Sequence, residues 1–87
     1  MPNLFRQMKV IDPLGVQETD DPKVADQRGY YKLEQWTKDS QQVDQMLWGG
    51  KSIDIAQERF AAAVKHRPRG RYTVRQGIKV LSRWPNE

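Results

Sequence analysis

The segment closest to a known chemical motif is Gly49-Gly50-Lys51-Ser52, which lies between a predicted strand and a predicted helix. Glycine, lysine and serine in this order end the phosphate-binding loop of nucleotide hydrolases, where backbone N–H groups hold the phosphates. That loop also needs a glycine five positions before Gly50, and Gln45 stands there. We therefore expect an ordinary strand-to-helix turn, whose helix N-terminus would hold an anion only weakly.

The other titratable residues do not form a catalytic or metal-binding pattern. His66 is the single histidine, it has no acidic neighbour in sequence, and the chain has no cysteine. Asp20 and Asp21 lack the spaced oxygen ligands of a calcium loop. Asp54 and Glu58 are four residues apart on one helical face, where solvation is the simpler interpretation. We expect no catalytic residue, no metal site and no cofactor, and therefore a protein that is not an enzyme.

Positive charge is concentrated in the C-terminal part of the chain. The net charge is +4, but residues 1–50 carry a net charge of −2 and residues 51–87 a net charge of +6. Within the basic part, the candidate polyanion-binding residues are Arg67, Arg69, Arg71, Arg75, Lys79 and Arg83. Arginine binds phosphate and carboxylate in a bidentate manner, which favours recognition of a polyanion. The alternative is a solvated face that keeps a small protein soluble.

The length of 87 residues allows one small domain. No apolar run is long enough to cross a bilayer, and the first ten residues lack the apolar stretch of a secretory signal. We therefore expect a cytoplasmic protein with no membrane partner. Residues 1–29 are interpreted as an N-terminal arm followed by an acidic loop or linker over 17–29, and residues 30–87 as the folded domain.

Strand and helix signals begin at Tyr30. Residues 30–36 and 43–48 are rich in strand-forming residues and are separated by a polar turn, which predicts a hairpin. The two glycines at 49–50 are expected to end its second strand. Residues 53–66 then show helical spacing of apolar side chains, with Ser52 as the capping residue.

The segment from Arg71 to Trp84 is compatible with two structures. A helix from Thr73 would bury Gly77, at a cost of about 1 kcal/mol relative to alanine. A hairpin with a three-residue loop over 75–77 would instead use Gly77 in the left-handed conformation and pair Val74 with Ile78. We favour the hairpin, which gives the order hairpin, helix, hairpin.

The predicted fold class is therefore α+β, a two-layer ββαββ domain with an N-terminal arm. In its opening strand from Tyr30, its helix with Ala56 and Phe60, and its closing unit around Gly77, the chain resembles short uncharacterised bacterial ββαββ proteins. The resemblance covers residues 30–84. It implies the fold but no activity.

Side-chain alternation predicts two faces of the sheet. The face beneath the helix is expected to gather the apolar residues Tyr31, Leu33, Val43, Leu47, Tyr72, Val74, Ile78 and Val80. The opposite face is expected to present an interaction set of Tyr30, Trp36, Met46 and Trp48, next to Arg71, Arg75 and Lys79.

Two functions follow from that opposite face. Exposed apolar side chains are typical of interfaces, which predicts a small non-enzymatic protein that binds another protein or a second copy of itself. Aromatic rings between arginines are also typical of surfaces that bind RNA or single-stranded DNA. The apolar segment 4–16 could instead cover this face from within the same chain.

Overall fold

The computed structural model describes residues 17–85. These residues form, in chain order, β1 (Glu18–Thr19), α2 (Pro22–Gln27), β2 (Tyr31–Trp36), β3 (Val43–Gly50), α3 (Ile53–His66), β4 (Arg71–Gln76) and β5 (Lys79–Trp84). The predicted α+β fold class and the ββαββ order are confirmed. The apolar segment 4–16, which could cover the sheet, lies outside the described residues.

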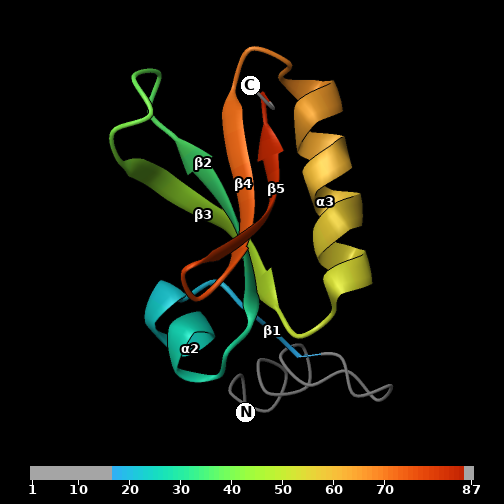
Figure 1. The fold of residues 1–87 in the computed structure, drawn as a ribbon. Helices are drawn as coiled ribbons and strands as arrows, with labels where there is room; N and C mark the ends of the chain where they lie inside the picture. Colours follow the sequence, from blue (N-terminus) through green and yellow to red (C-terminus); the bar gives the residue numbers. More distant parts are fainter. Residues whose placement is uncertain (1–16, 86–87) are drawn as a thin grey trace, which may run out of the picture.

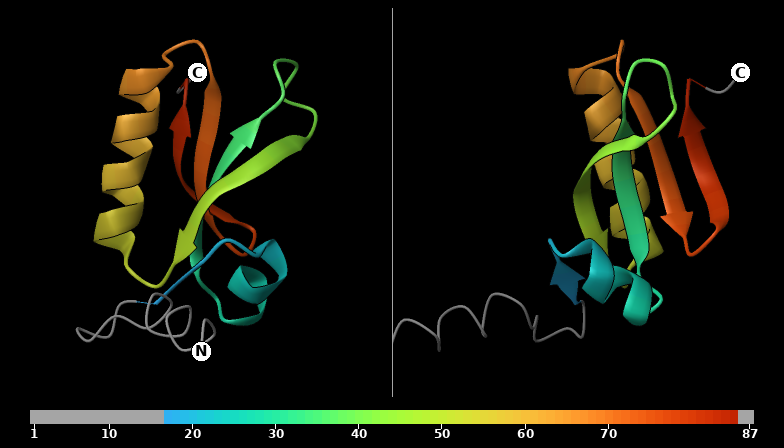
Figure 2. Two further views of the ribbon diagram at one scale, coloured as in Figure 1. Left: turned by 180° about the vertical axis from the view of Figure 1, so that it is seen from behind. Right: turned by 90° about the vertical axis from the view of Figure 1, so that its left-hand side faces the viewer.

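The strands form one antiparallel sheet in the order β1-β3-β2-β4-β5. Helix α3 packs along one face of this sheet against β2, β3 and β4. Figure 1 shows the short helix α2 on the other side of the strands, at the end of the sheet near β1, and Figure 2 shows the same two layers from behind and from the side. We call the face away from α3 the outer face.

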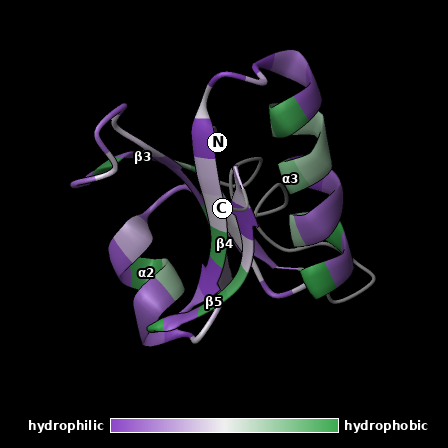
Figure 3. Ribbon diagram, turned by 45° about the horizontal axis from the view of Figure 1, so that its top comes forward, coloured by the Kyte–Doolittle hydropathy of each residue, from purple (hydrophilic) through white to green (hydrophobic). Residues whose placement is uncertain are grey.

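Helix α3 has the bounds that the sequence predicts. The Ser52 side chain accepts a hydrogen bond from the backbone N–H of Ile55 at 3.2 Å, which satisfies one of the free donors at the N-terminus. Asp54 in the first turn and Lys65 in the last turn complement the helix dipole. Figure 3 shows hydrophobic and hydrophilic residues alternating along α3, as expected for a helix with one buried side.

The core lies between α3 and the sheet. Its fully or nearly buried members are Leu33, Trp48, Ala56, Tyr72 and Val74. Register explains this set, because Leu33 of β2 pairs with Trp48 on one side and with Val74 on the other, so all three side chains face α3.

Gly50 is required by the position of the Trp48 ring. A Cβ atom added at Gly50 would lie 2.5 Å from Cζ2 of Trp48 and 2.8 Å from the Gln17 carbonyl oxygen. The ring therefore lies over the glycine, and its Nε1 donates to Glu18 Oε2 at 2.6 Å.

The expectation that glycines 49 and 50 end the strand is wrong, since β3 continues to Gly50 and pairs there with Glu18.

The interpretation of residues 17–29 as a loop or linker is also wrong for most of that segment. Glu18 and Thr19 add a fifth strand to the sheet. Helix α2 follows, with Asp21 accepting a hydrogen bond from the backbone N–H of Lys23 at 2.9 Å and with Pro22 in the first turn. Proline has no N–H to lose there, so the residues that suggested a loop start a helix.

The first hairpin has the predicted strands but a different arrangement of faces. Irregularities in the pairing leave Leu47 and Asp44 of β3 without a direct partner on β2. Each extra residue reverses the alternation of side chains beyond it. As a result Trp48 faces α3, whereas Val43, predicted for the core, pairs with Trp36 on the outer face. Leu47, also predicted for the core, is 40% exposed.

The second hairpin is confirmed over 71–84, but its predicted three-residue loop is wrong. The turn contains only Gly77 and Ile78, because Gln76 pairs with Lys79. Gly77 has a φ of 59°, which favours glycine. Ile78 stands at the tip and is 97% exposed.

The pairing beyond this turn also differs from the prediction. Leu81 is an extra residue in β5, between Ser82, which pairs with Val74, and Val80, which pairs with Arg75. Val80 lies on the outer face because the two-residue turn pairs it with Arg75. Beyond the extra residue, Tyr72 pairs with Trp84 instead of Val80.

Candidate functional site

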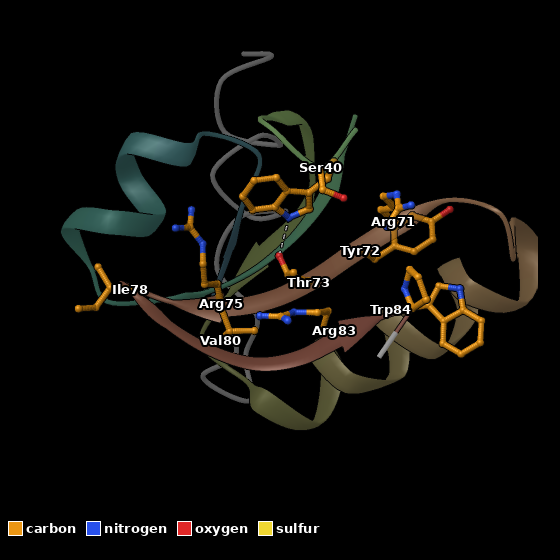
Figure 4. A pocket seen from close by; sticks show the side chains of 11 residues that line it. Ser40, Arg71, Tyr72, Thr73, Arg75, Ile78, Val80, Arg83 and Trp84 are labelled. Carbon is orange, nitrogen blue, oxygen red and sulfur yellow. Dashed lines mark hydrogen bonds between the residues drawn. The ribbon is translucent and has the colours of Figure 1, made fainter. Parts of the chain in front are cut away.

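A groove runs over the outer face of β4 and β5. It has a volume of about 410 Å³ and is lined from three elements, by Trp36, Ser40, Arg71, Thr73, Arg75, Ile78, Val80 and Arg83 among others. Figure 4 shows Arg71, Thr73 and Arg75 along β4 and the side chains of Arg83 and Val80 along β5. We call this the outer groove.

Trp36 is held in place within the outer groove. Its Nε1 donates to the hydroxyl of Thr73 at 2.9 Å, a contact between β2 and β4. Trp36 also pairs with Arg71 in register across these strands. The indole is neither buried nor fully exposed, so part of it remains available to a ligand in a fixed orientation.

The end of the groove nearest α2 rests on a buried network of charges. Glu34 accepts two hydrogen bonds from Arg75, from Nε at 2.7 Å and from Nη2 at 2.9 Å. Nζ of Lys32 lies 3.7 Å from the second oxygen of Glu34 and 2.6 Å from Oδ1 of Asp26 in α2. Lys32 and Glu34 are each only 4% exposed. This pairing accounts for two charged residues in the interior of so small a domain.

Arg75 is therefore largely committed to the protein itself. The hydrogen bonds that Arg75 donates to Glu34 raise the pKa of Arg75 above its ordinary value, with desolvation acting in the opposite direction. Its Nε and Nη2 are occupied by the carboxylate, which leaves Nη1 as the donor free of that pairing. Arg75 is consequently a fixed, mostly neutralised feature of the groove.

Arg71 and Arg83 carry the uncompensated charge of the outer groove. Within residues 17–85 neither of them forms a salt bridge or a side-chain hydrogen bond. Arg83 pairs in register with Thr73, and Arg71 with Trp36, so both side chains lie on the outer face. Two free guanidinium groups beside a fixed indole can bind the phosphates of a ligand whose base stacks on the ring.

A second hollow of about 510 Å³ adjoins the outer groove at the loop between α3 and β4. It is lined by Gln35, Trp36, Lys38, Arg67, Pro68, Arg69, Gly70, Arg71 and Tyr72. We call it the loop hollow. The loop is fixed from the sheet, since the Tyr72 hydroxyl donates to the Arg67 carbonyl at 3.1 Å and Nε1 of Trp84 donates to the Pro68 carbonyl at 2.9 Å.

The predicted polyanion-binding residues are thus divided between two adjoining hollows. Arg71, Arg75 and Arg83 line the outer groove, and Arg67, Arg69 and Arg71 line the loop hollow. Lys79, the first residue of β5, is exposed and lines neither.

The predicted interaction set is not brought together. Trp36 and Met46 both lie on the outer face, where Met46 pairs with Glu34. Trp48 belongs to the core on the opposite side, because of the extra residue in β3. Tyr30 precedes β2 and is 5% exposed, with its hydroxyl hydrogen-bonded to Gln17 and Arg28. The predicted placement of Tyr30 and Trp48 on an open face is therefore wrong.

Several lining residues were missed from the sequence. Val80 and Ile78 line the groove because the turn has two residues. Two-residue hairpin turns of type II′ take glycine at their first position, so the Gly77-Ile78 pair could have predicted this register. Lys38 and Ser40 come from the loop between β2 and β3, where sequence spacing gives no signal of what they approach.

The other sequence candidates stand apart from both hollows. Ser52 uses its hydroxyl to cap α3, and His66 is an exposed residue at the end of that helix. Among residues 17–85, no three histidine, cysteine or acidic side chains gather where they could hold a metal ion. Within the same residues, no helix has the length and apolar character that a membrane span requires.

Comparisons with known protein families, with curated proteins and with solved structures find no match to this chain. The resemblance to short bacterial ββαββ proteins stays a prediction.

Proposed function

We propose that this protein binds single-stranded nucleic acid in the outer groove. The observation that carries the proposal is the arrangement of Trp36 beside Arg71 of the adjacent strand β4, with Arg83 of β5 on the far side of β4. Neither arginine has an anionic partner within residues 17–85. A half-exposed indole offers a stacking surface to any unpaired base, and the guanidinium groups offer donors to phosphate.

The same observations favour nucleic acid over a protein partner. The protein-interaction hypothesis depended on an exposed set of apolar rings, and two of its members, Tyr30 and Trp48, are buried within the chain. What the outer face offers in their place is cationic. A polyanion complements that surface better than an apolar partner does.

Binding of fluorescently labelled oligothymidylate and oligouridylate to the full chain at low salt tests the proposal. The double variant Arg71→Gln/Arg83→Gln should weaken binding by about tenfold or more, because it removes two charge-assisted contacts. The control is Lys23→Gln/Arg59→Gln, which changes the net charge equally at exposed positions on α2 and α3, outside both hollows.

A substitution of the indole separates stacking from charge. Trp36→Leu should weaken binding by about 1–3 kcal/mol, whereas Trp36→Phe should retain most of the affinity, because it keeps an aromatic face. No binding of either oligonucleotide at low salt, or an equal loss in the groove and control variants, would contradict the proposal. Binding of an acidic protein without binding of oligonucleotides would point to the protein-interaction hypothesis.

A further inference from the structure

The outer groove and the loop hollow form one continuous surface. The two hollows share three lining residues, Trp36, Arg71 and Tyr72, and therefore meet directly at these side chains. Trp36 therefore stands where one hollow passes into the other, with Arg83 on one side and the loop after α3 on the other.

The loop hollow adds positive charge of its own. Lys38, Arg67 and Arg69 are exposed side chains on its rim, and none of them forms a salt bridge within residues 17–85. They come from two loops that are distant in sequence and close in space. Uncompensated cations at this end continue the charge pattern of Arg71 and Arg83 beyond the outer groove.

The loop that carries Arg67 and Arg69 is preorganised. Besides the hydrogen bonds from Tyr72 and Trp84, the backbone N–H of Gly70 donates to the Arg67 carbonyl at 3.0 Å. A Cβ atom at Gly70 would collide with the Tyr72 ring, so the glycine permits the ring to lie against the loop. Cations on a backbone that is already ordered bind with a smaller entropic cost than cations on a free loop.

We infer that the two hollows together form one track for a single strand long enough to contact both. The inference rests on the proposed function and specifies its ligand: an unpaired base at Trp36, phosphates near Arg71 and Arg83 on one side, and further phosphates near Lys38, Arg67 and Arg69 on the other. The six residues of β4 alone span about 17–20 Å. A strand of a few nucleotides can therefore occupy only one part of the track.

The test compares a short and a long oligothymidylate, of about four and about ten nucleotides. On the unaltered full chain, the long strand should bind about tenfold to hundredfold more tightly, because its second part binds as a tethered ligand. In the double variant Arg67→Gln/Arg69→Gln, this gain should fall to the part that the larger number of binding registers gives, while the affinity for the short strand stays the same. The same comparison with oligouridylates shows whether RNA and DNA use the same track.

The controls separate this inference from its alternatives. A longer homopolymer also gains from its larger number of binding registers, and that part of the gain should survive in Arg67→Gln/Arg69→Gln. Survival of the whole gain in this variant would overturn the inference. An equal loss for short and long strands would also overturn it, since it would indicate only a general effect of net charge, which Lys23→Gln/Arg59→Gln reports independently.

Two further results distinguish the failure of this inference from the failure of the proposed function. Short strands that bind in an Arg71- and Arg83-dependent manner, without any gain from length, would remove the track and leave the proposed function standing. Absence of binding for both lengths would remove both. A duplex of the longer sequence should bind more weakly than the single strand, because its paired bases cannot stack on Trp36.

Discussion

Glu34 shows how a single side chain organises this small protein. Its carboxylate is nearly buried and lies between two cations, Arg75 and Lys32. A buried carboxylate without partners would be strongly unfavourable, so the cations are part of what allows the sheet to close over it. By holding Arg75, Glu34 also determines which arginines of the outer groove remain open to a ligand.

Replacing Glu34 by glutamine should destabilise the protein by about 2–3 kcal/mol. The expected cost is at the lower end for a broken buried ion pair, because the Arg75 side chain is 25% exposed and Lys32 keeps Asp26. Chemical denaturation measures the change in the free energy of unfolding. The control Glu58→Gln, on the exposed side of α3, should change it by less than about 0.5 kcal/mol. A similar small change for Glu34→Gln would contradict the role given to the network.

The carboxyl group of Asp39 should titrate below its ordinary pKa of 3.8. The hydroxyl of Thr37 donates to Asp39 Oδ1 at 2.6 Å, and this hydrogen bond, followed by the one from the backbone N–H of Gln41, lowers the pKa. Because the pKa is lower in the folded state, the ionised carboxylate stabilises the loop at pH values above the pKa of the unfolded state. This contribution is lost as the pH falls through the pKa of the folded state.

Thr37→Val removes the larger of the two causes. The pKa of Asp39, followed by the pH dependence of its side-chain carbon chemical shift, should rise toward 3.8 in this variant. The same titration of the unaltered protein serves as the reference. An unchanged titration of Asp39 would show that the hydroxyl does not hold the carboxylate in solution.

At the scale of elements, local signals gave the helix and long-range pairing decided the faces. The capping residue, the spacing of apolar side chains and the breaking residues after His66 all lie within or next to α3, so its bounds could be read directly. The faces of β3 and β5 depend on extra residues at Leu47 and Leu81, which have no local signature. That is why the arginines of the candidate site were found while Trp48 was assigned to the wrong face.

Ser52→Ala should destabilise the protein by about 1 kcal/mol, within the range of about 0.5–2 kcal/mol for a lost N-terminal cap. The reason is the loss of the hydrogen bond from the Ile55 N–H, for which Ser52 is the side-chain acceptor found within residues 17–85. Thermal and chemical denaturation report the change. Ser52→Asp, which keeps an acceptor at the same position, should restore most of the stability, and failure of this rescue would contradict the capping role.

Gly77→Ala should cost about 1–2 kcal/mol, because a side chain at a φ of 59° is strained. Apart from the two adjoining residues of the chain, no atom of the described part of the protein lies within 4 Å of the added Cβ, so the cost comes from the backbone conformation. The neighbouring change Ile78→Ala, at the other position of the same turn, should be neutral within about 0.5 kcal/mol, since that side chain is 97% exposed. Equal effects of the two changes would contradict the turn.

At the scale of the whole molecule, the chain separates a negative half from a positive half. Two acidic residues of the negative half have partners within the fold. Glu18 accepts a hydrogen bond from Trp48, and Asp26 forms a salt bridge with Lys32. The arginines after α3 are mostly left without such partners within residues 17–85, and they border hollows. Under the proposed function, this distribution favours the approach of a polyanion to the face that holds the two hollows.

The salt dependence of binding should therefore grow with strand length. The quantity to compare is the slope of the logarithm of affinity against the logarithm of salt concentration. A short strand that contacts two free arginines should give a slope of about −1.4. A long strand that contacts five cations should give a slope of about −3.5. Anisotropy titrations over a series of potassium chloride concentrations measure both slopes. Identical slopes for the two lengths would contradict the difference in the number of contacts.

The extra residue Leu81 also determines which changes of length the C-terminal hairpin tolerates. It lets Leu81 pack against the core and Ser82 contact Gln57 of α3, while Val80 and Arg83 keep their places on the outer face. Deleting it would restore strict alternation and leave both faces as they are, since Val80 would still pair with Arg75 and Ser82 with Val74. Only the packing of Leu81 against the core would be lost. A variant of this chain that lacks Leu81 should accordingly keep Val80 in the groove and Trp84 over the core.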